Sequence, residues 1–377
     1  MKITSITARI CNAEMRNWIF VRVETDQPGL IGWGEATLEF KTRAVIGAIE
    51  DIEPMLVGLD PRDIEHCYQV MTRHGFWRMG VIGMTAISGI EMALWDVLGK
   101  KRNAPVYELL GYKKAYPKLP YASQLFGDTP AGTLAGCRSA RDRGYRAVKC
   151  GWGPFGRGSL SDDRDHLQAA REGLGHEGTL LIDAGQIFRE DVDAAAARIA
   201  MLEEVGATWL EEPFHGGAYD AYGKLAARSG GIKLAGGEAS HNVHMARQLI
   251  DYGKVSYIQI DCGRIGGIGP AKQVADYAAA RGVTYVNHTF TSHLALCASL
   301  QPFAGLEKDV ICEYPFAPKS VAWDMTETHL TPDDNGHVNV PDAPGLGVAM
   351  SAEGMAKYLV DAEISVKGKV LYRTPKL

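Results

Sequence analysis

The chain has 377 residues, lacks any block of basic residues and carries a formal net charge of −5. A protein whose main partner is nucleic acid or an anionic membrane surface usually carries such a block, so we expect neither partner. The N-terminus, MKITSITARI, alternates polar and apolar residues and lacks the apolar segment and cleavage site of a signal peptide. No apolar stretch approaches the ~20 residues that a membrane-spanning helix needs. We therefore expect a cytoplasmic globular protein.

Cysteine is also scarce, since there are only seven scattered cysteines and no C-x-x-C pair. This pattern predicts reduced, mostly buried thiols and excludes a disulfide framework and a cysteine-bound zinc site. No Gly-rich dinucleotide-binding fingerprint follows the first strand of the repeated region. The Gly-rich segment KCGWGPFGRGSL lacks the spacing and the Lys-Ser/Thr pair of a phosphate-binding P-loop. We interpret it as an active-site loop in which Trp152 lines the pocket.

Two kinds of pattern divide the chain. Residues 1–113 contain three strand-like runs, followed by helical segments at about 42–57 and 61–73. A Gly- and aromatic-rich loop then precedes the helix MTAISGIEMALWDVLGKKRN, which is apolar nearly all round and should therefore be buried. The last segment, 321–377, contains no further βα unit, so we expect it to leave the central region, 114–320, and pack elsewhere.

The central region alternates short β-rich runs with amphipathic helical stretches. Eight β runs fit between about residues 117 and 316, namely LPYASQL, RAVKCG, TLLIDAG, TWLEEPF, KLAGGE, YIQIDCG, TYVNHTF and VICEYPF. Repeated βα units of this length predict parallel strands with crossover helices. Eight such units favour a closed (β/α)8-type barrel over the alternative, an open doubly wound sheet.

Seven consecutive β runs place an ionisable residue near their C-terminal end: Lys149, Asp183, Glu211, Glu238, Asp261, His288 and Glu313. In a barrel of parallel strands these ends converge on one mouth. That mouth would hold five carboxylates, which repel one another strongly unless a cation lies among them. A single strand end is often polar for no functional reason, so only the whole set of seven indicates a functional site.

The carboxylates of the third, fourth and fifth of the eight runs are Asp183, Glu211 and Glu238. They form an all-oxygen set on neighbouring strands. Mg²⁺ accepts such a set when waters and substrate oxygens complete its octahedron, whereas zinc prefers histidine or cysteine. The adjacent Glu212 alternates away from Glu211, so we interpret it as a structural partner and not as a ligand.

Asp261 and His288 end the sixth and seventh runs, which are neighbours in a barrel. An aspartate beside a histidine fixes the tautomer of the imidazole and raises its basicity, which suits a general acid/base. Lys149 could polarise a substrate oxygen, act as a base if its pKa is lowered, or neutralise the carboxylates. His293 falls in the next helix, and we interpret it as structural.

A series of motifs now resembles a known family. In chain order they are GWGEAT, TAISGIEMALWDVLGK, LLIDAGQ, WLEEPF, LAGGEAS, YIQIDCGRIGGI, NHTF, CEYPF and PGLG. Together they resemble the mandelate-racemase-like subgroup of the enolase superfamily, over nearly the whole chain. The resemblance implies an α+β capping domain, built from residues 1–113 and the tail 321–377, over a modified (β/α)7β barrel of residues 114–320.

The same resemblance implies a catalytic site. In this family a bound Mg²⁺ holds a carboxylate of the substrate, and a base removes the proton alpha to that carboxylate. The members also form homo-oligomers. Carried over by motif, the metal would be bound by Asp183, Glu211 and Glu238, His288 would act as acid/base with Asp261, and Glu313 would lie near the substrate.

Two departures from the family pattern narrow the function. Racemase-type members carry Lys-x-Lys on the second strand, with the second lysine as a base, but KCG places Gly151 there. We do not expect a two-base racemase, because the face opposite His288 then lacks its base. Galactonate-dehydratase-like members place a histidine two residues after the first metal ligand, where this chain has Gly185. That substrate is therefore not carried over.

A site with one histidine can take the alpha proton and return it to a departing β-hydroxide. We therefore expect a Mg²⁺-dependent acid-sugar dehydratase, acting on an aldonate or aldarate, that forms a 2-keto-3-deoxy acid. The alternatives are an epimerase or racemase, a lactone cycloisomerase, and a non-catalytic metal-binding module, which the aligned charges disfavour. Lys149 would be an electrophilic helper or a spare base. Loop residues would bind the polyhydroxylated anion, namely Trp18, Trp77, Arg78 and Trp152.

Overall fold

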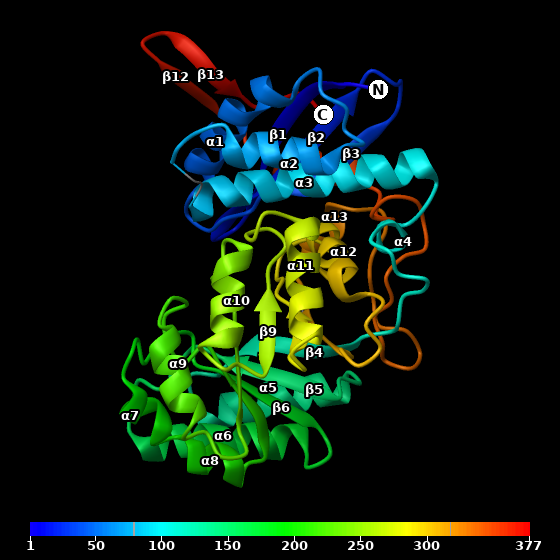
Figure 1. Cartoon of the computed structure of the whole chain (residues 1–377). Helices are drawn as coiled ribbons and strands as arrows, with labels where there is room; N and C mark the ends of the chain where they lie inside the picture. The colour runs from blue at the N-terminus through cyan, green and yellow to red at the C-terminus, as the bar shows by residue number, and fades with distance from the viewer. Residues whose placement is uncertain (78–79, 317) are drawn as a thin grey trace.

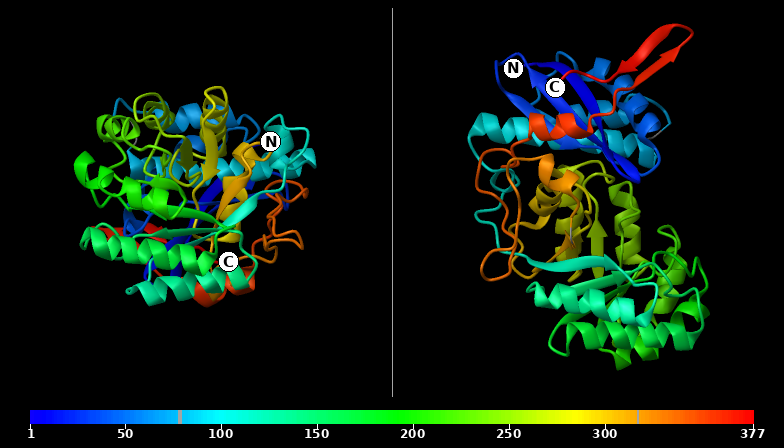
Figure 2. Two further views of the ribbon diagram at one scale, coloured as in Figure 1. Left: turned by 90° about the horizontal axis from the view of Figure 1, so that it is seen from below. Right: turned by 180° about the vertical axis from the view of Figure 1, so that it is seen from behind.

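The eight β runs form one parallel sheet in the computed structural model, which describes residues 1–77, 80–316 and 318–377. Its strands are β4 (Leu119–Leu125), β5 (Ala147–Gly151), β6 (Thr179–Asp183), β7 (Ala207–Glu211), β8 (Lys233–Gly236), β9 (Tyr257–Ile260), β10 (Thr284–Asn287) and β11 (Ile311–Pro315). The order is β10-β9-β8-β7-β6-β5-β4-β11, so the last strand pairs with the first of the repeat. The sheet thus curls into a nearly closed barrel, and the predicted fold class is confirmed (Figure 2).

A side chain bridges the remaining gap between β10 and β11. Asn287 donates from Nδ2 to the backbone oxygen of Glu313 at 3.2 Å, and its Oδ1 accepts from the Glu313 backbone N–H at 2.9 Å. The buried amide of Asn287 therefore imitates a peptide group of the missing strand ladder. This pairing fixes the height at which Glu313 enters the barrel mouth.

Helices cover the outside of the barrel: α5 (Pro130–Asp142), α6 (Leu160–Leu174), α7 (Val192–Ala196), α8 (Ile199–Glu204), α9 (Tyr219–Ala226), α10 (Val243–Asp251), α11 (Ile268–Ala279), α12 (His293–Leu300) and the 3-10 helix η1 (Gln301–Phe303). Five of them begin at a side chain that accepts from the backbone N–H three residues on: Thr129, Ser159, Asp191, Asn242 and Ser292. Such caps satisfy donors that the first helical turn leaves free. They also fix where the preceding loop at the mouth ends.

The N-terminal region forms an antiparallel sheet with three long helices at one end of the barrel (Figure 1). Its elements are β1 (Ile3–Ala13), β2 (Arg16–Thr25), β3 (Ile31–Glu35), α1 (Thr42–Leu56), α2 (Ile64–Arg73) and α3 (Val81–Arg102), followed by α4 (Val106–Leu109). The helix α3 packs closely on β3, because a Cβ at Gly32 or Gly34 would lie 2.0 Å from a backbone oxygen of α3. Only glycine permits this approach.

The helix α3 corrects one expectation. It is long and apolar enough to cross a membrane, whereas no apolar stretch of nearly this length was expected. However, 78% of the most apolar 18-residue stretch of this helix is buried inside the molecule. Its apolar surface is explained by contacts with the N-terminal sheet on one side and with α11 of the barrel on another.

The C-terminal segment returns to the N-terminal sheet. It contains α13 (Ser320–Asp324), α14 (Ala352–Tyr358) and the hairpin of β12 (Glu363–Val366) and β13 (Lys369–Arg373). The Tyr372 hydroxyl donates to the backbone oxygen of Ala8 at 3.1 Å, and the Val360 N–H donates to the oxygen of Ile10 at 2.8 Å. Figure 1 shows both chain ends in this part of the molecule. The domain limits at residues 113 and 320 stay predictions.

Candidate active site

Lys149 lies at the centre of a buried charge cluster in the barrel mouth. Its Nζ lies 2.7 Å from Glu211 Oε1, 3.0 Å from Glu313 Oε1 and 3.6 Å from Asp183 Oδ2. The strand register brings these groups together, since β5 pairs Gly151 with Asp183 and β6 pairs Asp183 with Glu211. All four side chains are at most 7% exposed. The ammonium group therefore offsets part of the repulsion that the sequence predicted.

His288 forms the second centre. Its Nδ1 lies 2.8 Å from Asp261 Oδ2, and its Nε2 lies 3.0 Å from Glu238 Oε2. The other carboxylate oxygen of Asp261 accepts from the Gly263 N–H at 2.6 Å. The structure thus brings together the aspartate and histidine that were expected to form a dyad. The Gly263 N–H holds the carboxylate oxygen of Asp261 that does not contact the imidazole, and this contact orients the aspartate.

Glu313 joins the two centres. Its Oε1 accepts from the Ser123 hydroxyl at 2.9 Å and contacts Lys149, while its Oε2 accepts from the Thr289 N–H at 2.8 Å and lies 3.9 Å from His288 Nε2. All seven residues that were predicted from the strand ends are therefore part of one connected site. Their chemical roles stay predictions.

Burial and repulsion shift the pKa values of this cluster. Burial, reinforced by Glu238 and Glu313, raises the pKa of Asp183 to about 6 despite the nearby ammonium group. Burial also raises the pKa of Glu211 well above its usual value. For His288 burial acts in the opposite direction, but the surrounding carboxylates outweigh it and raise the pKa of the imidazole. The cluster holds more acidic than basic groups and would be stabilised by a further cation.

Asp183, Glu211 and Glu238 offer the oxygen donors for such a cation. In the structure Asp183 and Glu211 face Lys149, whereas Glu238 pairs with His288. Among the described residues, no three ligating side chains already meet at one point. An all-carboxylate set on adjacent strands fits a hard divalent ion such as Mg²⁺, and we expect Glu238 to exchange its contact with His288 for the ion.

Glu212 has other partners. Its carboxylate accepts from Gln186 Nε2 at 2.6 Å and from the Gly237 N–H at 3.4 Å, and no ion pair joins it to Lys149 among the described contacts. Burial raises the pKa of Glu212 to about 8. This placement agrees with the strand alternation that turned Glu212 away from Glu211.

Gly151 leaves room for Asp183. A Cβ at this glycine would lie 2.8 Å from Asp183 Oδ2 and 2.9 Å from Asp183 Cβ. A lysine at this position could not coexist with Asp183 as it is placed here. The glycine that replaces the second lysine of the Lys-x-Lys pattern thus makes room for Asp183, a candidate metal ligand.

Gly151→Ala should displace the Asp183 carboxylate for the same reason. We expect the affinity for Mg²⁺, measured by titration calorimetry, to fall by about 10-fold or more. Gly47→Ala is the matched control, because nothing lies within 4 Å of the added methyl group. Equal Mg²⁺ affinity in both variants would show that Asp183 is not held in a position that the metal needs.

Trp152 and Gly185 also form a close pair. Trp152 adopts a left-handed backbone with φ of 58°, and a Cβ at Gly185 would lie 2.9 Å from its indole. The Trp152 N–H donates to the backbone oxygen of Asp183 at 3.2 Å, and its side chain is 53% exposed. The indole therefore lies beside a candidate metal ligand at the mouth. Its contact with a substrate stays a prediction.

Two of the other expected substrate-binding residues, Trp18 and Trp77, are described by the structure, and no contact described for either joins it to this cluster. Trp18 was expected in a loop, and this is wrong, because the turn falls at Glu14 and Met15 and Trp18 lies inside β2 with its side chain 5% exposed in the core. Trp77 is 88% exposed and contacts Phe76 edge-on. Arg78 lies outside the described residues.

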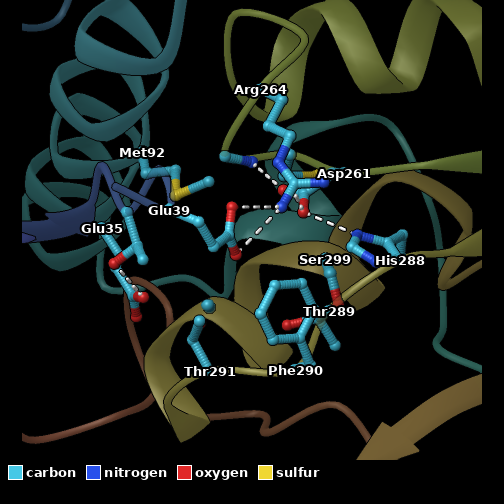
Figure 3. A pocket seen from close by; sticks show the side chains of 14 residues that line it. Glu35, Glu39, Met92, Asp261, Arg264, His288, Thr289, Phe290, Thr291 and Ser299 are labelled. Atoms are coloured by element: carbon cyan, nitrogen blue, oxygen red, sulfur yellow. Dashed lines mark hydrogen bonds and ion pairs between the residues drawn. The ribbon is translucent and has the colours of Figure 1, made fainter. Parts of the chain in front are cut away.

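Sequence reasoning missed a group of charged residues beside the dyad, of which Figure 3 shows Arg264 and Glu39. Arg264 Nη2 lies 3.2 Å from Glu39 Oε2, and its Nε lies 3.7 Å from Asp261 Oδ2. Arg16 Nη1 lies 2.9 Å from Glu39 Oε1. The only signal in the sequence was that Arg264 follows Asp261 by three residues on the same loop. Glu39 comes from the N-terminal region, and nothing in its local sequence marks it.

Two family models match the chain across these features. The model described as Mandelate racemase / muconate lactonizing enzyme, N-terminal domain, matches residues 4–111, and the model described as Enolase C-terminal domain-like matches residues 133–354. The chain belongs to the mandelate-racemase-like group of the enolase superfamily. It is therefore an enzyme of this superfamily, and its N-terminal sheet and helices are the capping domain over the barrel.

Several solved structures resemble this enolase-superfamily enzyme along nearly its whole length. A predicted mandelate racemase from Rhodobacter sphaeroides is 49% identical over 99% of each chain, with a TM-score of 0.90. The 3,6-anhydro-D-galactonate cycloisomerase from Zobellia galactanivorans is 28% identical over 96% of this chain and 100% of its own, with a TM-score of 0.86. A predicted dehydratase from Salmonella Typhimurium is 28% identical over 95% and 98%, with a TM-score of 0.88.

Proposed function

We propose that this enzyme is a Mg²⁺-dependent acid-sugar dehydratase, which converts an aldonate or aldarate to a 2-keto-3-deoxy acid. The observation that carries the proposal is the presence of one imidazole, His288, with Asp261 on its Nδ1, together with the absence of a base at Gly151. A single base can remove the alpha proton and protonate a leaving group on the same face of the substrate.

The protein groups have separate roles in this elimination. His288 takes the alpha proton, and the electrons of that C–H bond form a double bond between the alpha and beta carbons. The beta C–O bond breaks as the departing hydroxide takes the proton back from His288 and leaves as water. The remaining enol becomes the 2-keto acid when it loses its hydroxyl proton and gains a proton at the beta carbon. Asp261 keeps the imidazole oriented throughout.

The bound cation would supply the charge that this step needs. Mg²⁺ held by Asp183, Glu211 and Glu238 would attract the substrate carboxylate and stabilise the negative charge that develops on it. Lys149, which contacts Asp183 and Glu211 as well as Glu313, adds positive charge on that side of the site. Glu313, fixed by Ser123 and Thr289, would lie near the substrate.

A second candidate is opening of a cyclic ether or lactone, and the similarity to the 3,6-anhydro-D-galactonate cycloisomerase favours it. Its chemistry would be the same elimination, with a leaving oxygen that stays attached through the ring. A racemase or epimerase is less well supported, because the remaining candidate for a second base, Lys149, is engaged by three carboxylates within 3.6 Å. We also propose that the enzyme forms a homo-oligomer, as its family predicts.

A substrate panel tests the proposal. The protein is incubated with Mg²⁺ and with aldonic acids, aldaric acids, their lactones and 3,6-anhydro sugar acids, and 2-keto acid formation is assayed. Product from an open-chain acid supports the dehydratase, whereas product from cyclic substrates alone supports the second candidate. Alpha-deuteration of recovered substrate in D2O without keto acid would indicate an epimerase. Silence across the panel, with Mg²⁺ binding demonstrated by calorimetry, would contradict the proposal.

A further inference from the structure

The capping domain reaches the catalytic dyad through a chain of alternating charges. Glu39, in the turn between β3 and α1, binds Arg16 of the first hairpin at 2.9 Å and Arg264 of the barrel at 3.2 Å. Arg264 in turn faces Asp261 at 3.7 Å, and Asp261 accepts from His288 at 2.8 Å. Figure 3 shows Glu39 and Asp261 on different sides of the Arg264 side chain.

Arg264 and His288 lie against the same oxygen atom of Asp261. The Nε of Arg264 and the Nδ1 of His288 both face Asp261 Oδ2, since the other oxygen, Oδ1, accepts from the Gly263 N–H. The 3.7 Å separation from Arg264 is an ionic contact and not a hydrogen bond. An arginine free of other partners would approach a buried carboxylate with two hydrogen bonds, because its fork of donors matches the carboxylate.

Other contacts hold the same loops against the cap. Glu91 of α3 accepts from the backbone N–H groups of Ile268 and Gly269, just after Arg264. Ser292, which follows His288 by four residues, donates to Glu35 at the end of β3. The backbone around the dyad is therefore fixed, so a change at Glu39 would act through the Arg264 side chain more than through the loop.

We infer that Glu39 of the capping domain is a positioning residue for the dyad, because it holds Arg264 away from Asp261 and leaves Asp261 Oδ2 to His288. The inference rests on the proposed role of His288 as the base. It assigns to the cap a part in orienting the base, in addition to enclosing the substrate.

If Glu39 has this role, kcat should fall in a single variant and recover in a double variant. Glu39→Gln removes the charge that retains Arg264, so Arg264 moves onto Asp261 and displaces His288. We expect kcat to fall by about 10- to 100-fold with KM changed less than about threefold, since the base loses its orientation while the substrate contacts remain. The double variant Glu39→Gln/Arg264→Gln removes the competitor as well. It should recover much of the kcat that Glu39→Gln loses, although it carries one more substitution.

A measurement that needs no substrate completes the test. Protein labelled with 15N-histidine is examined by NMR with Mg²⁺ present, and the His288 Nδ1–H signal is identified by its loss in His288→Asn. A hydrogen bond to a carboxylate moves this proton downfield. The signal should move upfield or broaden in Glu39→Gln and return in the double variant. Glu24→Gln is the matched control, because Glu24 pairs with Arg22 elsewhere in the cap, and it should leave the signal unchanged.

Each outcome decides the inference. An unchanged His288 signal in Glu39→Gln, or a double variant that is worse than the single one in both measurements, overturns it. If Glu39→Gln melts far below the wild type, Glu39→Asp is used in its place. The shorter aspartate keeps the negative charge but lies farther from Arg264. We then expect a smaller upfield shift of the His288 signal. A substrate panel that stays silent would contradict the proposed function, while the NMR result would still decide the role of Glu39.

Discussion

Replacement of His288 with asparagine is expected to lower kcat by about 10²- to 10⁴-fold, the contribution of a positioned acid/base to a proton transfer. The imidazole has Asp261 on one ring nitrogen, and its other nitrogen lies 3.0 Å from Glu238, the carboxylate that we expect the metal to bind. Asparagine fills part of the same volume and keeps a polar contact to Asp261, but it cannot take a proton at neutral pH. Steady-state kinetics on the substrate found in the panel measures the loss, and calorimetry should show that Mg²⁺ still binds.

His293→Asn is the control for this prediction. His293 is also a buried histidine close in sequence, but its Nδ1 accepts from the Leu330 N–H and its ring packs against Trp323 and His329. We expect this variant to lose thermal stability while kcat stays within about threefold of the wild type. If His288→Asn kept kcat within the same range, His288 would not be the base, and the elimination would need another proton acceptor.

Replacement of Asp183 with asparagine should abolish activity by another route. The substitution removes one of three anionic ligands, so we expect Mg²⁺ affinity to fall by at least about 100-fold. Wild-type protein should melt at a higher temperature when Mg²⁺ is added, because an ion that binds only the folded state stabilises it. The variant should lose this increase. Differential scanning calorimetry with and without Mg²⁺ measures both effects.

A second prediction concerns the melting temperature of Asp183→Asn in the absence of metal. Without metal, Asp183→Asn should melt no lower than the wild type, because burial and neighbouring carboxylates already oppose the charge on Asp183, as the raised pKa of about 6 indicates. Asp193→Asn provides the comparison, since Asp193 forms an exposed ion pair with Arg228 and should change neither Mg²⁺ binding nor activity. A metal response in Asp183→Asn equal to that of the wild type would remove Asp183 from the ligand set.

The fold and the centre of the site could be predicted because both follow from the regular repeat of βα units along the sequence. The repeat of βα units implied a barrel, and a barrel brings every strand end to one mouth, whatever the details of the helices. Lys149, Asp183 and Glu211 could thus be placed together without any knowledge of their contacts. The motifs of the family then assigned chemistry to positions that geometry had already gathered.

The remaining features depend on how separate parts of the chain pack. Trp18 was misplaced because the hairpin turn is shorter than its sequence indicated, and a shift of one or two residues changes which side chains are buried. Glu39 and Arg264 are far apart in the chain and meet only when the cap lies on the barrel. Asn287, which closes the barrel with its side chain, imitates a backbone contact that no strand pattern reveals.

A crystal structure of the protein grown with Mg²⁺ tests the account most directly. We expect one ion bound by carboxylate oxygens of Asp183, Glu211 and Glu238 at about 2.1 Å, with Glu238 turned away from His288 and the imidazole still held by Asp261. Density without an ion at saturating Mg²⁺, with Glu238 still paired to His288 Nε2, would contradict the central claim that these three carboxylates bind the metal beside the base.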